Sequence, residues 1–477
     1  MSVTRIARSV GIICVVLALA LAVGLGAFLI AARQPAIDPI TPPPANSFAP
    51  DLLKRGAQLA ALGNCDVCHT AVGGRPFAGG RALPTPFGAI YATNITPDVD
   101  TGIGNWSEAA FKRAMRHGVR RDGAYLYPAF PYDHFTRVSD DDAKAIYAYL
   151  MTREPVRAVA PANELPFPLN VRSLMFGWDL LFLRPGPFRP DKNHDATWNR
   201  GAYLVEGLGH CGACHTPRNF LGAEKSDQDL SGGESEGWTA YALNAGSPAP
   251  VQWNADTLAH YLAFGFDASH GVARGPMAEV ADDLHALPEP DIRAIAAYLA
   301  DRAGHARPAV SEIERQRAVQ MQRGKTGAAN SADSQASIGA ADATHDDGAA
   351  IYLSACAGCH EGPRAVPFGG IDLALSSGVA GPNATNLFNV VLHGLPAADA
   401  THAPVMPGFG AAMNDAQLVA LARYLRARFT DKEPWPDVEQ SLREARSATR
   451  AATTRSAPSD RLMPPSTKPG AGNEAQR

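Results

Sequence analysis

The longest uninterrupted apolar stretch of the chain covers residues 9–32 and contains no charged side chain. A helix of that length rises about 36 Å, which is enough to cross a bilayer with some tilt. Arg5 and Arg8 precede it, so the positive-inside rule keeps the N-terminus in the cytoplasm and exports the body of the chain. The sequence therefore predicts a single transmembrane helix, and the alternative is a cleaved secretory signal.

An amphipathic pattern then recurs three times, over residues 142–150, 291–299 and 415–425. Each copy begins with Asp, ends with a Tyr-Leu pair, and places apolar side chains three or four residues apart. That period predicts a helix with one buried face. Ser139 and Asn414 are expected to be the N-caps of the first and third copies.

A shorter helix is expected ahead of each copy, beginning near a glycine: Gly56, Gly201 and Gly348. Because glycine has no Cβ, it lets another helix approach closely. We expect the amphipathic helix of each unit to cross there, with its Tyr-Leu pair packed into the contact. The chain is thus predicted to be all-α, with three tandem helical modules after the apolar segment.

Composition sets the predicted boundaries between these parts. The proline-rich connector contains the apolar run 174–183, which is too short to span a bilayer and predicts a packed connector or an interfacial or partner-binding helix. The linker is rich in Ala, Gly, Ser and charged residues. The predicted parts are an anchor or signal at 1–33, modules at 48–153, 196–302 and 346–430, a connector at 154–195, a linker at 303–345, and an extension at 431–477 that is disordered from about residue 446.

The charge of the chain excludes nucleic-acid binding as its function. The 477 residues carry a net charge of -4, which provides no basic surface for nucleic acid. The hydrophobic content of 46% is enough for each module to bury its own core.

Six of the seven cysteines lie in three C-x-x-C-H motifs, and these are Cys65, Cys68 and His69; Cys211, Cys214 and His215; and Cys356, Cys359 and His360. The motifs follow one another at separations of 146 and 145 residues. This pattern is the attachment signature of c-type haem. Two thiols on one helical turn can add to the two vinyl groups of a haem, and the adjoining imidazole then reaches the iron. The alternatives, a zinc half-site or a redox dithiol, do not account for three histidine-tailed copies. The sequence therefore predicts three haem c groups.

Two methionines stand where a second iron ligand is expected. Met277 lies 62 residues after His215, and Met406 lies 46 residues after His360. Both are flanked by proline or glycine in predicted loops, from which a thioether can reach the iron opposite the histidine.

The first module breaks this pattern, because Phe130 occupies the place of Met277 and cannot ligate iron. We expect His134 to be the sixth ligand. The alternatives are an open or water-occupied site, or ligation by Met115 or His117.

Several further stretches are distinctive, namely 78–80, 86–88, 94–98, 101–104, 210–218 and 275–280. With the three motifs, they make the chain resemble the three-haem cytochrome c subunits of membrane-bound bacterial dehydrogenases that oxidise alcohols, gluconate or aldehydes. The resemblance covers about residues 48–445. It implies that the six cysteines attach haem, that the three motif histidines are proximal ligands, and that Met277 and Met406 are distal ligands. It also implies that the haem modules lie on the periplasmic side of the inner membrane.

The resemblance also bears on the partner. The sugar and alcohol dehydrogenase cytochromes usually have methionine at the position of Phe130. The phenylalanine form, together with residues 249–253, looks more like the subunits that accompany molybdenum hydroxylases of the nicotinate or isoquinoline kind. The catalytic partner is therefore expected to be a molybdenum hydroxylase, a flavoprotein or a quinoprotein.

The predicted function is electron transfer from that partner dehydrogenase through three haems to ubiquinone or a terminal oxidase. We do not expect the chain to be an enzyme. The alternatives are a peroxidase-like enzyme with an open first haem, and a free-standing carrier linked to an oxidase.

Overall fold

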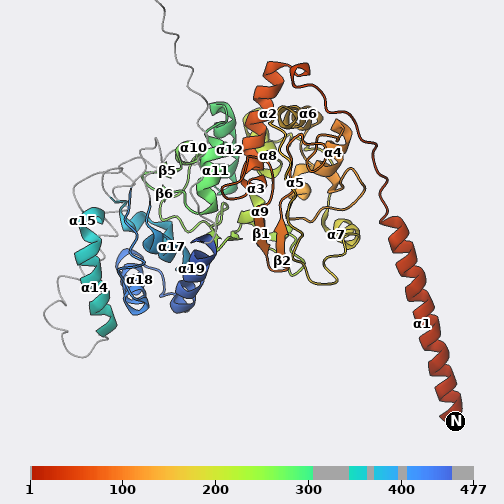
Figure 1. The fold of residues 1–477 in the computed structure, drawn as a ribbon. Coiled ribbons are helices and arrows are strands. Elements are labelled where there is room, and N and C mark those ends of the chain that lie inside the picture. Colours follow the sequence, from red (N-terminus) through yellow and green to blue (C-terminus); the bar gives the residue numbers. More distant parts are fainter. Residues whose placement is uncertain (1–2, 305–342, 362–369, 396–404, 454–477) are drawn as a thin grey trace, which may run out of the picture.

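The computed structural model describes residues 3–304, 343–361, 370–395 and 405–453 of the chain. A long N-terminal helix projects from a helix-rich body (Figure 1). The helices are α1 (Val3–Ala31), α2 (Pro50–Leu62), α3 (Cys65–His69), α4 (Glu108–His117), α5 (Tyr132–Phe135), α6 (Asp140–Met151), α7 (Leu174–Phe182), α8 (Ala196–Glu206), α9 (Gly212–His215), α10 (Ala255–Phe264), α11 (Pro276–Leu284), α12 (Glu289–Arg302), α14 (Ala343–Ala355), α15 (Ala357–His360), α16 (Ser377–Ala380), α17 (Thr385–His393), α18 (Asp415–Phe429) and α19 (Val438–Thr453). Short 3-10 turns cover Ala45–Ser47, Ser226–Gln228 and Leu373–Leu375.

Three helix pairs form the framework of the body: α2 with α6, α8 with α12, and α14 with α18. Each pair crosses at the predicted glycine. A Cβ on Gly56 or Gly201 would lie 2.0 Å from a backbone carbonyl oxygen of the partner helix, and one on Gly348 would lie 2.3 Å from such an oxygen. In each pair the tyrosine of the Tyr-Leu sequence packs beside the glycine, so the predicted close contact is confirmed.

One detail of these pairs differs from expectation, and another agrees with it. The glycines lie in the middle of the first helices, which begin several residues earlier than predicted. The predicted N-caps are confirmed, because the Ser139 side chain accepts from the Asp142 amide and the Asn414 side chain accepts from the Gln417 amide. Capping is a local interaction and was therefore readable from the sequence.

The expectation of an all-α chain is too simple. Among the described residues, three two-stranded antiparallel ribbons accompany the helices. The first pairs Ala82 with Tyr91, the second pairs Gly233 with Ala240, and the third pairs Phe266 with Val272. They are formed by β1 (Ala82–Thr85) and β2 (Gly88–Tyr91), β3 (Gly233–Ser235) and β4 (Trp238–Ala240), and β5 (Phe266–Asp267) and β6 (Gly271–Val272).

The C-terminal extension also differs from expectation. Helix α19 continues to Thr453, beyond the point at which disorder was predicted to begin. Its Val438, Leu442 and Ala445 side chains are buried in the core formed by α17 and α18. Tertiary burial therefore stabilises a helix that composition did not indicate. Most of the predicted linker and residues 454–477 lie outside the described residues.

The first two helix pairs share one hydrophobic core. It joins Leu59 and Ile146 of the first pair to Leu204 and Tyr298 of the second, all buried almost completely. The third pair has a separate core around Tyr352, with α17 and α19. The described body therefore contains two large hydrophobic cores. We call residues 50–151, 196–302 and 343–429, which contain the three helix pairs in order, the first, second and third units.

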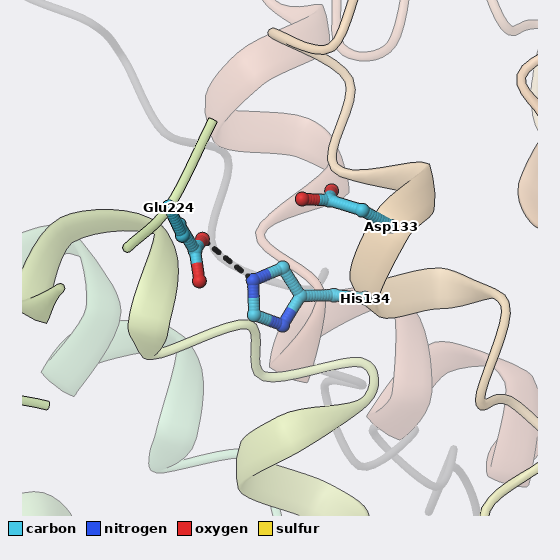
Figure 2. A group of neighbouring side chains, drawn as sticks. All are labelled: Asp133, His134 and Glu224. Carbon is cyan, nitrogen blue, oxygen red and sulfur yellow. Dashed lines mark hydrogen bonds and ion pairs between the residues drawn. The ribbon is translucent and has the colours of Figure 1, made fainter. Parts of the chain in front are cut away.

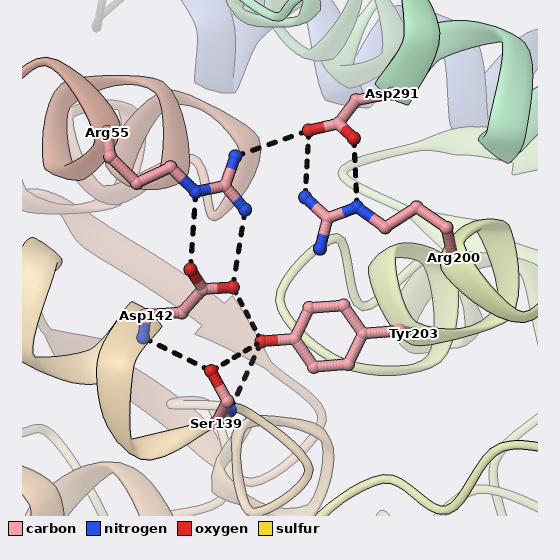
Figure 3. A network of polar contacts seen from close by, with 6 residues as sticks. All are labelled: Arg55, Ser139, Asp142, Arg200, Tyr203 and Asp291. Carbon is pink, nitrogen blue, oxygen red and sulfur yellow. Dashed lines mark hydrogen bonds and ion pairs between the residues drawn. The ribbon is translucent and has the colours of Figure 1, made fainter. Parts of the chain in front are cut away.

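A polar network also joins the first two pairs (Figure 3). Arg55 donates two hydrogen bonds to Asp142 and a third, of 3.2 Å, to Asp291 across the junction. Arg200 holds Asp291 with bonds of 2.8 and 2.9 Å, and the Tyr203 hydroxyl donates to Asp142 at 2.7 Å. Burial opposes ionisation of Asp291, but the two guanidinium groups hold its pKa below the ordinary value. Arg55 of the first pair thus binds the Asp of both pairs, and Arg200 of the second pair binds Asp291.

Candidate haem sites

Each C-x-x-C-H motif forms a short helical turn directly after the first helix of its pair: α3, α9 and α15. None of their six cysteines is paired in a disulfide within the described residues. Burial raises the pKa of Cys68 to about 11 and also raises that of Cys214. Neutral thiols three positions apart on one turn fit addition to the two vinyl groups of one haem and do not fit a disulfide framework.

The three motif histidines share one orientation, in which Nδ1 bonds to a backbone carbonyl and Nε2 is left available to iron. The contacts are His69 with Thr93 at 2.6 Å, His215 with Tyr241 at 2.6 Å, and His360 with Ile371 at 2.8 Å. A bond from Nδ1–H to a carbonyl fixes the tautomer and the ring plane of a metal-ligating histidine. Burial also lowers the pKa of His69 and His215, which favours the neutral ring that can donate a lone pair. The residues present therefore fit a haem at each motif.

The second and third motifs open into one cavity of about 550 Å³. His215 and Met277 both line it, as do His360 and Met406, and the first motif contributes Cys68. Apolar side chains such as Leu262, Val391 and Leu421 form much of the remaining wall, which suits the faces of a porphyrin ring.

Backbone geometry places both methionines on this wall. Gly275, two residues before Met277, has a φ of 58°, and a Cβ there would lie 2.5 Å from the Trp238 ring. Only glycine fits so close to that ring. In the third unit, Met406 exchanges two backbone hydrogen bonds with Leu395, of 2.8 and 3.0 Å.

The structure does not place His134 as a haem ligand. Its Nδ1 lies 2.9 Å from the Glu206 carbonyl oxygen, and its Nε2 lies 2.7 Å from the Glu224 carboxylate (Figure 2). Both ring nitrogens are therefore engaged, and both partners belong to the second unit. The expectation that His134 ligates the first iron does not fit this geometry, because a ligand needs one free nitrogen.

His134 and Glu224 instead form an ion pair between the first two units. Burial disfavours both charges, but their mutual hydrogen bond dominates, so the pKa of His134 is raised and that of Glu224 is lowered. Asp133 lies beside the pair, and its pKa is raised by burial.

The other candidates of the first unit are placed differently from one another. Phe130 packs edge-on against Phe135, with ring centroids 5.2 Å apart. Met115 is 4% exposed in the shared core, whereas His117 is exposed at the end of α4. Helices α4 and α10 each end at a left-handed glycine, and Met115 has the same offset from Gly118 as Leu262 has from Gly265.

The sequence did not indicate the carbonyl partners of the proximal histidines or the role of Glu224. Backbone acceptors leave no residue-type signal. The polar network that joins the first two units did leave a signal in the sequence. An Arg-Gly pair and an Asp at the start of the amphipathic pattern recur in both units.

Comparisons with known proteins define the class. A family model described as cytochrome c matches residues 53–154, and one described as cytochrome C oxidase, cbb3-type, subunit III matches residues 343–425. Together with the motif geometry, these matches place the chain among the c-type cytochromes.

The relatives define the family more narrowly. The chain is 37% identical over 415 residues to the fructose dehydrogenase cytochrome subunit of Gluconobacter japonicus, covering 84% of each protein. It is 39% identical to the gluconate 2-dehydrogenase cytochrome c subunit of Pantoea cypripedii, covering 79% of this chain and 85% of the relative. The chain belongs to this family of cytochrome c subunits of dehydrogenase complexes, which are electron-transfer subunits and not catalytic ones.

Another relative is much longer than this chain. A nicotinate dehydrogenase subunit of Pseudomonas putida is 45% identical over 414 residues, which cover 86% of this chain. The chain spans only 33% of the length of that relative.

Proposed function

We propose that this chain carries three haem c groups, one on each motif, and passes electrons from a catalytic dehydrogenase subunit to ubiquinone or a terminal oxidase. The observation that carries the proposal is the threefold repetition of one arrangement: two thiols on a helical turn, followed by a histidine whose Nδ1 is held by a carbonyl. Bound haem supplies reversible one-electron chemistry, and the protein supplies its placement and tunes its potential.

The haem of the second motif lies between the other two in this proposal. Cys68 of the first motif and His360 of the third line the cavity that holds His215. The second and third units are also bonded directly, because Asn386 accepts from the Thr239 amide at 2.9 Å and donates to the Thr239 carbonyl at 2.8 Å. These contacts support a fixed relay through the second haem.

We assign the distal positions of the second and third haems to Met277 and Met406, and that of the first to Met115. Three observations support Met115. His134 has no free nitrogen, Met115 is buried, and Leu262 lines the cavity beside His215 from the equivalent position on its helix. A thioether one turn from the end of α4 would then take the role that Met277, at the position equivalent to Phe130, has in the second unit.

The partner is proposed to be a molybdenum hydroxylase of the nicotinate kind, with a flavoprotein or a quinoprotein as the alternatives. The similarity to the nicotinate dehydrogenase subunit of Pseudomonas putida supports this choice. Co-purification from native membranes tests it, since a molybdenum-containing subunit is expected with the cytochrome. Recovery of a flavin or quinone subunit would redirect the assignment.

Helix α1 is proposed to be a retained single-pass anchor in the inner membrane, with the haem units on the periplasmic side. Its segment Ile12–Ala31 is long and apolar enough to cross a bilayer, and none of it is buried inside the protein. The chain that follows is held on the first unit, because the Ile37 amide donates to the Arg121 carbonyl and Gln34 donates to the Tyr125 hydroxyl. Because the residues that follow α1 are hydrogen-bonded to the first unit, we favour retention of the helix over its cleavage as a signal.

Haem counting tests the central proposal. The mature protein is expected to contain three covalent haems by pyridine haemochrome assay. Replacing both cysteines of one motif with serine should remove one haem, and the result should be the same for each motif. A mature protein with two haems would refute the proposal for the motif whose replacement changes nothing.

Spectroscopy tests the ligands separately. Met115→Leu, Met277→Leu and Met406→Leu should each abolish one methionine-to-iron charge-transfer band and leave the haem count at three. His134→Ala should leave all three bands. A Met115→Leu protein with unchanged bands would refute Met115 as the distal ligand of the first haem.

A further inference from the structure

Helix α7, the short apolar helix between the first two helix pairs, lies against the end of α1 (Figure 1). The Phe28 and Phe176 rings are 5.5 Å apart, and the backbone at Gly177 also faces the Phe28 ring. Phe28 belongs to the last turn of the segment that is proposed to cross the bilayer. The α7 helix therefore lies at the level where the anchor leaves the membrane.

The outer side of α7 is apolar. Leu180 is 64% exposed and Leu181 is 58% exposed. The adjacent loop adds Phe220 and Leu221, and it is tied to α7 because Trp178 Nε1 donates to the Leu221 carbonyl at 3.1 Å. We call these exposed residues, with Leu174, the α7 patch.

The single carboxylate of α7 is turned away from this patch. Asp179 accepts a hydrogen bond of 2.7 Å from the buried Tyr132 hydroxyl, and burial raises its pKa to about 7. On the inner side, Trp178 is 7% exposed and packs edge-on against Tyr132. The contacts of Trp178 and Asp179 with Tyr132 therefore fix the orientation of α7. In this orientation the Leu180 and Leu181 side chains point outward.

We propose that the α7 patch is inserted into the lipid headgroup and acyl boundary beside α1. The proposal rests on the anchorage of α1 proposed above. Continuity with the end of the anchor favours lipid over a protein partner, because a patch joined to the last membrane turn meets the bilayer first. An apolar helix face with no outward carboxylate suits that boundary. Arg184, exposed two residues after the end of α7, is placed to meet lipid phosphate.

This insertion of the α7 patch into the bilayer boundary, which we call the seat, would hold the haem units at a fixed height and tilt relative to the membrane. A single transmembrane helix leaves a body free to rotate about the helix axis, whereas a second contact beside the helix removes that freedom. The first unit, which packs on α7 through Tyr132, would then face the membrane in a defined orientation.

Photo-crosslinking in native membranes tests the seat on the full haem-loaded chain. Benzoylphenylalanine replaces Leu181 or Phe220, with Leu353 and Phe264 as exposed controls of matched residue type elsewhere on the body. Leu19, inside α1, reports on the anchor. Haem staining confirms that each variant has matured. Illumination followed by mass spectrometry of the peptides then identifies what each probe touched.

Lipid adducts at residues 181 and 220, comparable to those at residue 19 and absent at 353 and 264, are the expected result. Adducts to another protein at 181 and 220 would overturn the seat and identify the patch as a subunit interface. Lipid adducts at 19 alone would overturn the seat and leave the anchor intact. Their absence at 19 would overturn both proposals.

Discussion

The helix crossing at Gly201 gives a sharp test of how the body is built. In Gly201→Ala the new Cβ would lie 2.0 Å from the Ala294 carbonyl oxygen and 2.7 Å from the Tyr298 Cβ. Both are fixed parts of α12, so the helices must separate by about 1.4 Å to restore an ordinary contact. Overpacking of this kind costs about 3 kcal/mol, and the better helix propensity of alanine returns about 1 kcal/mol. We expect a net loss of about 2 kcal/mol.

Calorimetry on the haem-loaded chain can detect that loss and locate it. The two separate cores predict two transitions, one for the shared core of the first two pairs and one for the third pair. Gly201→Ala should lower the melting temperature of the first transition by about 4–8 °C. Gly348→Ala, which makes the equivalent clash in the third pair, should lower only the second.

The control is Gly378→Ala, because its new Cβ would approach no atom closer than 3.4 Å. It should leave both transitions in place. An unchanged first transition in Gly201→Ala would refute the reasoning, since it would mean that the crossing tolerates a methyl group. A shift of both transitions by either crossing variant would refute the division into two cores.

Three further predictions concern charged groups at the junctions. Asp179→Asn should raise the melting temperature more at pH 8 than at pH 4. Burial raises the pKa of Asp179 to about 7, so the stability of the native protein falls as pH rises from the unfolded-state pKa of this carboxyl toward 7. Equal effects of the substitution at both pH values would contradict this. Arg55→Ala should destabilise the shared core by about 1–3 kcal/mol in calorimetry, since two carboxylates lose hydrogen bonds to a charged partner, and an unshifted first transition would count against the network. The pair of His134 and Glu224 should stabilise the fold at pH values between the lowered pKa of Glu224 and the raised pKa of His134. This stabilisation is lost as pH falls through the pKa of Glu224 or rises through the pKa of His134. His134→Gln should therefore flatten the dependence of the melting temperature on pH, and an unaltered dependence would show that the pair does not contribute.

Much of the candidate chemistry could be predicted because it is local in the chain. Covalent haem attachment needs two thiols and an imidazole within five residues, so the motifs at Cys65, Cys211 and Cys356 are complete in the sequence. Helix period and capping act over three or four residues, which is why the Ser139 and Asn414 caps were confirmed. The crossing glycines were predictable because each recurs with a partner helix of the same pattern.

Other features depended on segments that are distant in the sequence. Residue types alone favour His134 as a ligand, but the fold brings Glu224, 90 residues later, to its Nε2. A shared core for the first two units and a helix at α19 depend on burial supplied by other elements, which no local pattern records.

The sequence by itself determined which residues can hold haem and where one segment can cross a membrane, because thiol spacing and apolar length are properties of contiguous residues. Only the tertiary structure decided which carbonyl orients each proximal histidine, which nitrogens of His134 are engaged, and that α7 lies beside the end of α1. The physical reason is that hydrogen bonding and burial satisfy whichever group the fold brings within reach, and residue order does not specify that group.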